Sequence, residues 1–263
     1  MPFINGQMCE LVDEARGRYR AQRPLAVNRK DGSVLVYVPG GEFEMGDGKD
    51  GDCPKHRVHV DGYWIGLNCV TNRQYGRFVA ETKHRVPDKA EYGTPVWQNG
   101  RCPEEKMDHP VVCVSWDDAV AYGKWAGLRL PTEAEWEKAA RGVKGLIYPW
   151  GDEWDEKRCR NANNRGSEET TVVWGYPGGV SGYGAGQQSG NVWEWCADWY
   201  DEKYYGKDEV RNPSGPPAGS YRVRRGGSWG DGVASDFRGA DRNWIDPSCR
   251  SGYQGFRLAR GAA

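Results

Sequence analysis

The second half of the chain has almost no helical periodicity, and this feature constrains its fold more than any other. From Gly142 to the C-terminus, the chain runs through frequent Gly and Trp residues with Asn and Pro among them, and has only short strand-like runs near Val192 and Tyr221. The chain of 263 residues holds 13 Trp, 14 Tyr and 37 Gly. Such a composition favours large aromatic side chains packed among glycine-rich ordered loops. Aromatic residues are too plentiful for a disordered chain.

Strands are predicted near the start of the periodic region. Residues 34–38 are β-branched and lie between glycine-containing turn signals, and residues 42–45 continue a strand pair. Residues 57–65 alternate between apolar and polar side chains, which predicts one further strand.

Three capping boxes predict helices. In each box, a Ser or Thr is followed three residues later by Gln, Asp or Glu, so that side chains and backbone satisfy each other's unpaired groups. These helices are expected to start at Thr71, Ser115 and Thr132 and to end near Thr82, Gly127 and Gly142. A short helix is also expected over residues 10–20. The pattern indicates an α+β fold with an N-terminal extension over residues 1–30 and one domain over residues 31–263.

Charge and cysteine usage exclude several classes of protein. The net charge of −1 implies no nucleic-acid partner, and no apolar run is long enough to insert into a membrane. The first residues show no signal peptide, so a cytoplasmic location is the default expectation, and surface display would require a removed leader. Eight scattered cysteines without a CxxC pair argue against a zinc cluster, and we expect mostly free thiols.

The C-terminal segment over residues 225–260 combines a rigid frame with exchangeable residues. The frame includes Arg-Gly-Gly-Ser-Trp at 225–229 and Gly-Phe-Arg-Leu at 255–258, together with arginines expected to brace loops, namely Arg238, Arg242, Arg250 and Arg257. Small or polar residues fill the gaps between them. A binding surface is built in this way, whereas an active site needs a few specific reactive groups.

Nine ordered sequence blocks resemble the formylglycine-generating-enzyme-like (sulfatase-modifying-factor) domain, an elaborated C-type-lectin-type fold. The blocks are GGEFEMG (40–46), HRVHVDGYWI (56–65), VTNRQYGRFV (70–79), HPVVCVSWDDAVAY (109–122), RLPTEAEWEKAARG (129–142), YPWGD (148–152), SGNVWEWCADWY (189–200), RRGGSW (224–229) and GFRLAR (255–260). The resemblance implies the fold, while function must be argued from the site.

The resemblance implies three different functions in different branches. The copper-dependent oxidase that makes formylglycine uses two cysteines shortly after the Arg-Gly-Gly-Ser-aromatic block, but residues 230–237 contain none. The ergothioneine-pathway sulfoxide synthases add an iron-binding helical bundle, and this chain has only four histidines and no such bundle. The variable proteins of diversity-generating retroelements keep the frame and vary residues that mutated adenines can encode.

We therefore expect a non-catalytic protein that displays a hypervariable C-terminal binding surface diversified by a retroelement. The alternative is a metal-dependent oxidase or an enzyme-associated member of the same family. The ligand would be an unidentified protein or other macromolecule, and the oligomeric state is left open. The ligand-binding positions are predicted to be Gly230, Asp231, Gly232, Ser235, Asp236, Asp241, Asn243, Ile245, Ser248, Cys249, Ser251, Gly252 and Tyr253, with the frame residue Trp244. Tyr253 and Trp244 are expected to supply most of the contact energy.

Two candidate metal sites are weighed separately. Residues 187–194 resemble a calcium loop of the family, with ligands from Gln187, Gly190, Val192 and Glu194, although the family usually has Asn at the first position. This implies a structural calcium ion, and no cofactor is expected to be required. Cys53, His56 and His59 have metal-like spacing, but strand alternation would place the two histidines on opposite faces, so no metal is predicted there.

Overall fold

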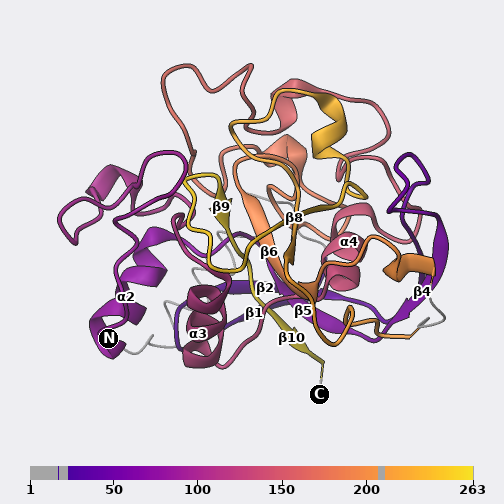
Figure 1. Cartoon of the computed structure of the whole chain (residues 1–263), viewed down its shortest axis with the longest axis horizontal. Coiled ribbons are helices and arrows are strands. Elements are labelled where there is room, and N and C mark those ends of the chain that lie inside the picture. Colours follow the sequence, from indigo (N-terminus) through magenta and orange to yellow (C-terminus); the bar gives the residue numbers. More distant parts are fainter. Residues whose placement is uncertain (1–16, 18–22, 207–210, 263) are drawn as a thin grey trace.

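The strands of the protein form three sheets. The computed structural model describes residue 17 and residues 23–206 and 211–262. One antiparallel sheet has the order β1-β2-β5-β10, a hairpin pairs β3 with β4, and the third sheet has the order β8-β7-β6-β9, in which only β6 and β9 run parallel (Figure 1). The strands are β1 (Leu25–Val27), β2 (Val34–Val38), β3 (Gly41–Met45), β4 (His56–Val60), β5 (Tyr63–Gly66), β6 (Trp193–Trp199), β7 (Arg222–Arg225), β8 (Asn243–Ile245), β9 (Gln254–Gly255) and β10 (Ala259–Gly261).

The three predicted helices are confirmed, each with a complete capping box. They are α2 (Asn72–Thr82), α3 (Trp116–Ala126) and α4 (Glu133–Arg141), and their N-caps are the predicted Thr71, Ser115 and Thr132. The remaining helical segments are single 3₁₀ turns: η1 (Glu104–Lys106), η2 (Glu156–Arg158), η3 (Pro177–Gly179), η4 (Tyr204–Gly206) and η5 (Ala234–Phe237). The α+β class with short strands and few helices is thus confirmed.

The strand predicted over residues 57–65 is wrong in one respect, because it is two strands in different sheets. β4 pairs with β3, whereas β5 pairs with β2 and β10. The break falls at Asp61-Gly62, where a side chain on Gly62 would collide with the hydroxyl of Tyr37. The alternating pattern continues across the turn, so periodicity alone did not reveal the break.

The first sheet, with the order β1-β2-β5-β10, includes residues that the sequence analysis assigned to an N-terminal extension. β1 lies inside the segment 1–30, yet Leu25, Ala26 and Val27 pair with β2. The helix predicted over residues 10–20 lies almost wholly outside the described residues. No helix in the described part of the chain has the length and apolar character to cross a bilayer.

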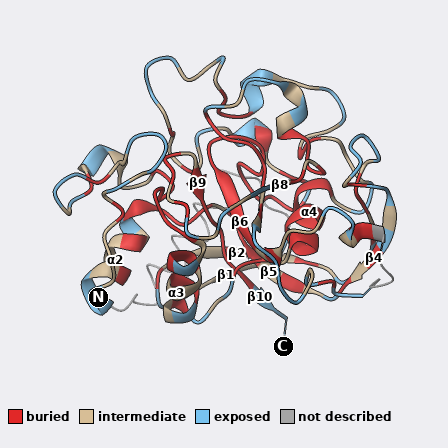
Figure 2. Cartoon of the chain, in the orientation of Figure 1, coloured by how far each residue is buried: buried red, intermediate tan, exposed pale blue. Residues whose placement is uncertain are grey.

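The core is rich in aromatic side chains, as the composition predicts. Trp136, Trp195, Tyr75 and Tyr122 are almost fully buried. The two indole N–H groups are satisfied, since Trp195 donates to the carbonyl of Val114 and Trp136 donates to Glu194. β6 crosses the middle of the molecule and is buried along most of its length (Figure 2). The C-terminal segment pairs directly with these sheets, since β9 pairs with β6 and β10 pairs with β5.

Candidate functional site

Buried arginines fasten the C-terminal segment to the body of the protein. Arg225 donates to three carbonyls of residues 239–241 and pairs with Glu137. Arg242 pairs with Glu133 through two bonds of 2.9 and 3.0 Å. The expectation that frame arginines brace loops is confirmed by these contacts. Buried side chains therefore fix much of the backbone path of the segment.

Asp47, Asp50 and Cys53 bring potential metal ligands within 4.8 Å of one another. Arg238 forms ion pairs with both carboxylates of this cluster. Its guanidinium supplies the positive charge that a metal ion would bring, and burial raises the pKa of the Cys53 thiol. The ion pairs with Arg238 therefore use the two carboxylates to anchor the C-terminal segment.

The thiols of the protein are buried and unpaired. Seven cysteines in the described part of the chain are free, which confirms the expectation of free thiols for these seven. Residues 230–248 contain no cysteine, and burial raises the pKa of the Cys249 thiol to about 11. A thiol with this pKa is protonated near neutral pH and is a poor copper ligand or nucleophile. The site lacks the paired thiolates that the oxidase branch uses.

The predicted ligand-binding positions differ in exposure. The exposed positions are Gly230, Gly232, Ser235, Ser248 and Trp244. The half-buried positions are Asp231, Asp236, Asp241, Asn243, Ile245 and Tyr253. Cys249, Ser251 and Gly252 are buried, and a side chain on Gly252 would press against the backbone of Thr94. The structure thus does not place these last three on the outer surface.

Tyr253 and Asp231, two of the predicted ligand-binding positions, are held by contacts within the protein. The ring of Tyr253 stacks on Trp229 with centroids 4.3 Å apart, and a Cβ on Gly230 would collide with it. The Asp231 carboxylate accepts hydrogen bonds from the backbone N–H and the hydroxyl of Ser228, at 2.8 and 2.7 Å. Both side chains contribute to the local fold as well as to the surface.

Trp244 lies on the opposite side of β8 from its neighbours Asn243 and Ile245. Side chains alternate along a strand, and Trp244 is paired with the buried Val223. Its ring is 43% exposed and packs against Tyr221 and Tyr200, with centroids 4.5 and 5.6 Å away. The predicted surface is therefore divided by β8 into two faces.

Arg224 occupies the face that Asn243 shares, and sequence reasoning missed it. Its Nε donates to Asn243 Oδ1 at 3.0 Å, and its guanidinium lies 4.9 Å from the ring of Trp193. No carboxylate of a described residue forms an ion pair with it. Burial lowers the pKa of Arg224, and the charge of Asp231 partly opposes this shift.

The signal for Arg224 was present in the sequence. The run Arg222-Val223-Arg224-Arg225 alternates in β7, so Val223 and Arg225 face inward while Arg222 and Arg224 share the other face. In the sequence, Arg224 belongs to a block that resembles the family (224–229), next to the frame that begins at Arg225. The strand period separates the buried Arg225 from the half-buried Arg224.

The residues of the predicted calcium loop do not fit a calcium ion. Glu194 accepts two hydrogen bonds from Arg257, at 2.6 and 2.7 Å, and a third from Trp136. Gln187 Oε1 accepts from Asn191 at 2.6 Å. A carboxylate already neutralised by a guanidinium offers little to a divalent cation.

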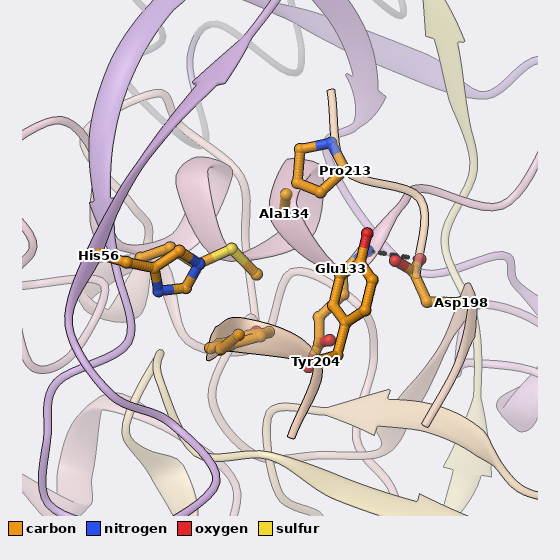
Figure 3. A pocket seen from close by; sticks show the side chains of 8 residues that line it. His56, Glu133, Ala134, Asp198, Tyr204 and Pro213 are labelled. Atoms are coloured by element: carbon orange, nitrogen blue, oxygen red, sulfur yellow. Dashed lines mark hydrogen bonds between the residues drawn. The ribbon is translucent and has the colours of Figure 1, made fainter. Parts of the chain in front are cut away.

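The predicted separation of His56 and His59 is confirmed by their contacts. His59 bonds to Asp61, whereas His56 packs against Tyr205 on the other side of β4. His56 borders a small hollow whose other wall includes Glu133 and Asp198 (Figure 3). Burial and the nearby Glu133 charge raise the pKa of Asp198 well above its usual value. The hollow is about the size of one water molecule, which is too small for an organic substrate.

Comparison with known proteins identifies the family. Residues 21–262 match the model described as the sulfatase-modifying factor enzyme 1-like domain. A formylglycine-generating enzyme of Streptomyces coelicolor is 38% identical, covering 86% of this chain and 89% of the relative. The inactive C-alpha-formylglycine-generating enzyme 2 of Mus musculus is 32% identical, covering 90% of this chain and 89% of the relative.

Two solved structures share the fold over nearly their whole length. PvdO from Pseudomonas aeruginosa superposes with a TM-score of 0.77 at 26% identity, covering 91% of this chain and 98% of PvdO. Treponema denticola variable protein 1 superposes with a TM-score of 0.74 at 23% identity, covering 92% of this chain and 99% of that protein. The relatives thus include proteins named as enzymes, one named as inactive and one named as variable.

Proposed function

This chain belongs to the family of sulfatase-modifying factor enzyme 1-like domains, and we propose that it is a non-catalytic member that binds a ligand through its C-terminal segment. The observation that carries the proposal is the chemistry of residues 230–249. This stretch holds one thiol, which is buried and has a raised pKa, and no second thiol to complete a pair. The oxidase branch of the family requires two thiolates for copper(I) at this place.

The C-terminal segment and the adjacent Arg224 present hydrogen-bonding and aromatic groups that can bind a ligand, although the segment lacks a pair of reactive thiols. The terminal nitrogens of Arg224, the amide of Asn243 and the aromatic ring of Trp244 all reach the surface from a backbone held by buried arginines. A surface fixed in this way loses little conformational entropy on binding. These features support recognition of a protein or other macromolecule.

The proposal includes diversification by a retroelement, in a narrower form than the sequence suggested. Exchange is compatible with the fold at the outward positions Gly232, Ser235 and Ser248, because they are exposed and the Cβ of a residue at 232 would meet only the flexible amide of Asn163 and the side chain of Ala162. The inward positions Cys249, Ser251 and Gly252 would remain constant. A near-identical repeat beside a reverse-transcriptase gene, differing at adenines in the outward codons only, is the expected genomic observation. A repeat that differs at all three inward codons would contradict this narrower form.

The experiment that tests the non-catalytic assignment is a copper assay. The purified protein is loaded with copper(I) and incubated with a cysteine-containing sulfatase peptide, with the Streptomyces coelicolor enzyme as the positive control. We expect no aldehyde by mass spectrometry from this chain under conditions in which the control converts the peptide. Aldehyde formation by this chain would overturn the proposal in favour of the oxidase alternative.

A further inference from the structure

Arg224 has hydrogen-bond donors that the protein does not use. An arginine has five N–H donors, and only its Nε–H, bound to Asn243, has an acceptor among the described residues. The terminal nitrogens are not enclosed by protein atoms. By contrast, every buried arginine of the described chain has carboxylate partners or, for Arg160, three backbone carbonyls.

Asn243 fixes the orientation of this guanidinium and adds donors of its own. Its Oδ1 accepts from Arg224 Nε at 3.0 Å and from the backbone N–H of Trp244 at 2.7 Å. Because an amide oxygen accepts and an amide nitrogen donates, two donors at this atom identify it as Oδ1. The Nδ2 group therefore faces away from both donors, and no described residue accepts from it. Arg224 and Asn243 present unpaired N–H groups side by side on paired strands.

We propose that Arg224 and Asn243 form the recognition point for a carboxylate on the ligand of the C-terminal surface. The inference rests on the proposed function, since it names the ligand chemistry of that same surface. The planar fork of a guanidinium matches a carboxylate through two parallel hydrogen bonds. The amide Nδ2 of Asn243 supplies a further donor beside the fork. Trp193, which is buried beneath the guanidinium, keeps its plane in place.

A second arginine on the same face strengthens the preference for an anion. Arg222 lies two residues earlier in β7, and its guanidinium is stacked between Trp116 and Trp199 at 3.6 and 3.5 Å from their ring centroids. No carboxylate of a described residue forms an ion pair with Arg222 either. Two half-buried cations about 7 Å apart along one strand face leave a local excess of positive charge.

The neighbouring acids favour a carboxylate over a phosphate. The charge of Asp231 acts on Arg224, and the charge of Asp117 acts on Arg222. These acids are too distant to form ion pairs with the arginines but close enough to repel a dianion. A singly charged, planar group meets less repulsion and uses the same donors.

The test compares two matched peptides. The probes are acetyl-Gly-Glu-Gly-amide and acetyl-Gly-Gln-Gly-amide, titrated into the full chain while the Arg Nε–H signals are followed by NMR. We expect the Glu peptide to bind about tenfold more tightly than the Gln peptide, because hydrogen bonds to an ionised acceptor are about twice as strong. The preference should disappear in Arg224→Gln and weaken in Asn243→Ala, and Arg224→Lys should recover only part of it. Arg57→Gln, at an exposed side chain of β4, is the matched control and should keep the preference.

Several outcomes would overturn the inference. Equal binding of the two peptides, no saturable binding of either at millimolar concentration, or an unchanged preference in Arg224→Gln would each do so. If the phosphoserine peptide acetyl-Gly-pSer-Gly-amide bound more tightly than the Glu peptide, the recognised group would be a phosphate and the carboxylate assignment would be wrong. Turnover in the copper assay would remove the proposed function while leaving the peptide preference to be measured. If the protein shows no turnover in the copper assay and no preference for the Glu peptide, only the carboxylate assignment is wrong and the proposed function stands.

Discussion

Asp241 is a residue of the C-terminal segment whose carboxyl group has a pKa far from its ordinary value because it is partly buried. Burial raises the pKa of this carboxyl to about 7, and the nearby Arg225 and Arg238 only partly oppose the shift. Between the unfolded pKa near 3.8 and the folded pKa near 7, the native state binds more protons than the unfolded state. The contribution of Asp241 to stability is therefore fully present below the lower pKa and is lost as the pH rises through the upper one.

We predict that Asp241→Asn reduces the loss of stability between pH 5 and pH 8. The variant keeps the shape of the side chain but cannot ionise, so it lacks the penalty of about 1.4 kcal/mol for each unit by which the pKa is raised. Urea unfolding of both proteins at the two pH values measures the difference. Identical pH dependence in the wild type and the variant would show that Asp241 titrates normally in the fold.

Tyr253 is the second residue whose structural role differs from its expected role. We predict that Tyr253→Ala destabilises the protein by about 2 kcal/mol, because it removes the half-buried ring that stacks on Trp229. Ser235→Ala is the matched control and should change the free energy of unfolding by less than about 0.5 kcal/mol, since its side chain is exposed. Chemical denaturation distinguishes the two cases. A Tyr253 variant as stable as the control would return this position to the freely exchangeable set.

At the scale of elements, residues 249–252 of the C-terminal segment form a loop that pairs with another loop. Glu91 and Gly252 each donate a backbone hydrogen bond across the contact, to Arg250 and Tyr92 respectively. This pairing brings residues 249–252 inward and is the reason that three predicted surface positions are buried. Sequence reasoning had no means to see it, because neither loop has a periodic pattern and the partners lie far apart in the chain.

A matched pair of glycines tests this arrangement. We predict that Gly252→Ser destabilises the protein by about 1–3 kcal/mol, because its Cβ would lie 3.0 Å from the backbone nitrogen and oxygen of Thr94, which cannot easily move. Gly232→Ser should be nearly neutral, because the nearest group is the flexible amide of Asn163. Thermal unfolding of both variants provides the comparison. Equal melting temperatures would mean that the loop contact yields without cost.

The helices and the β2 strand could be predicted from the sequence because their signals are local. Capping boxes are read from four consecutive residues, and each of the three predicted boxes was correct. Arg224 and the two faces of β8 could not be predicted in the same way. They depend on the register between β7 and β8, which is set by the burial of Val223 and by the arginines that anchor the connecting loop.

At the scale of the whole molecule, Glu194 and Arg257 join the two larger sheets. Glu194 belongs to β6, and Arg257 donates to its carboxylate and to the carbonyls of Gly66, Leu67 and Gly186. Gly66 belongs to β5 of the other sheet. Trp136 of α4 donates to the same carboxylate. The buried ion pair between Glu194 and Arg257 thus connects the β1-β2-β5-β10 sheet, the β8-β7-β6-β9 sheet and helix α4.

If Glu194 were a calcium ligand, calcium would raise the melting temperature. If Glu194 is the partner of Arg257, calcium should have no effect on it. We predict that Glu194→Gln lowers the free energy of unfolding by about 3–5 kcal/mol, because it leaves the Arg257 charge buried without its partner. The melting temperature of the wild type should be the same with calcium and with a chelator, and the loss in the variant should be the same in both. A ligand that binds only the native state would raise the melting temperature with concentration. A rise with calcium that is absent in Glu194→Gln would therefore contradict the ion-pair assignment and restore the calcium loop that the family resemblance implies.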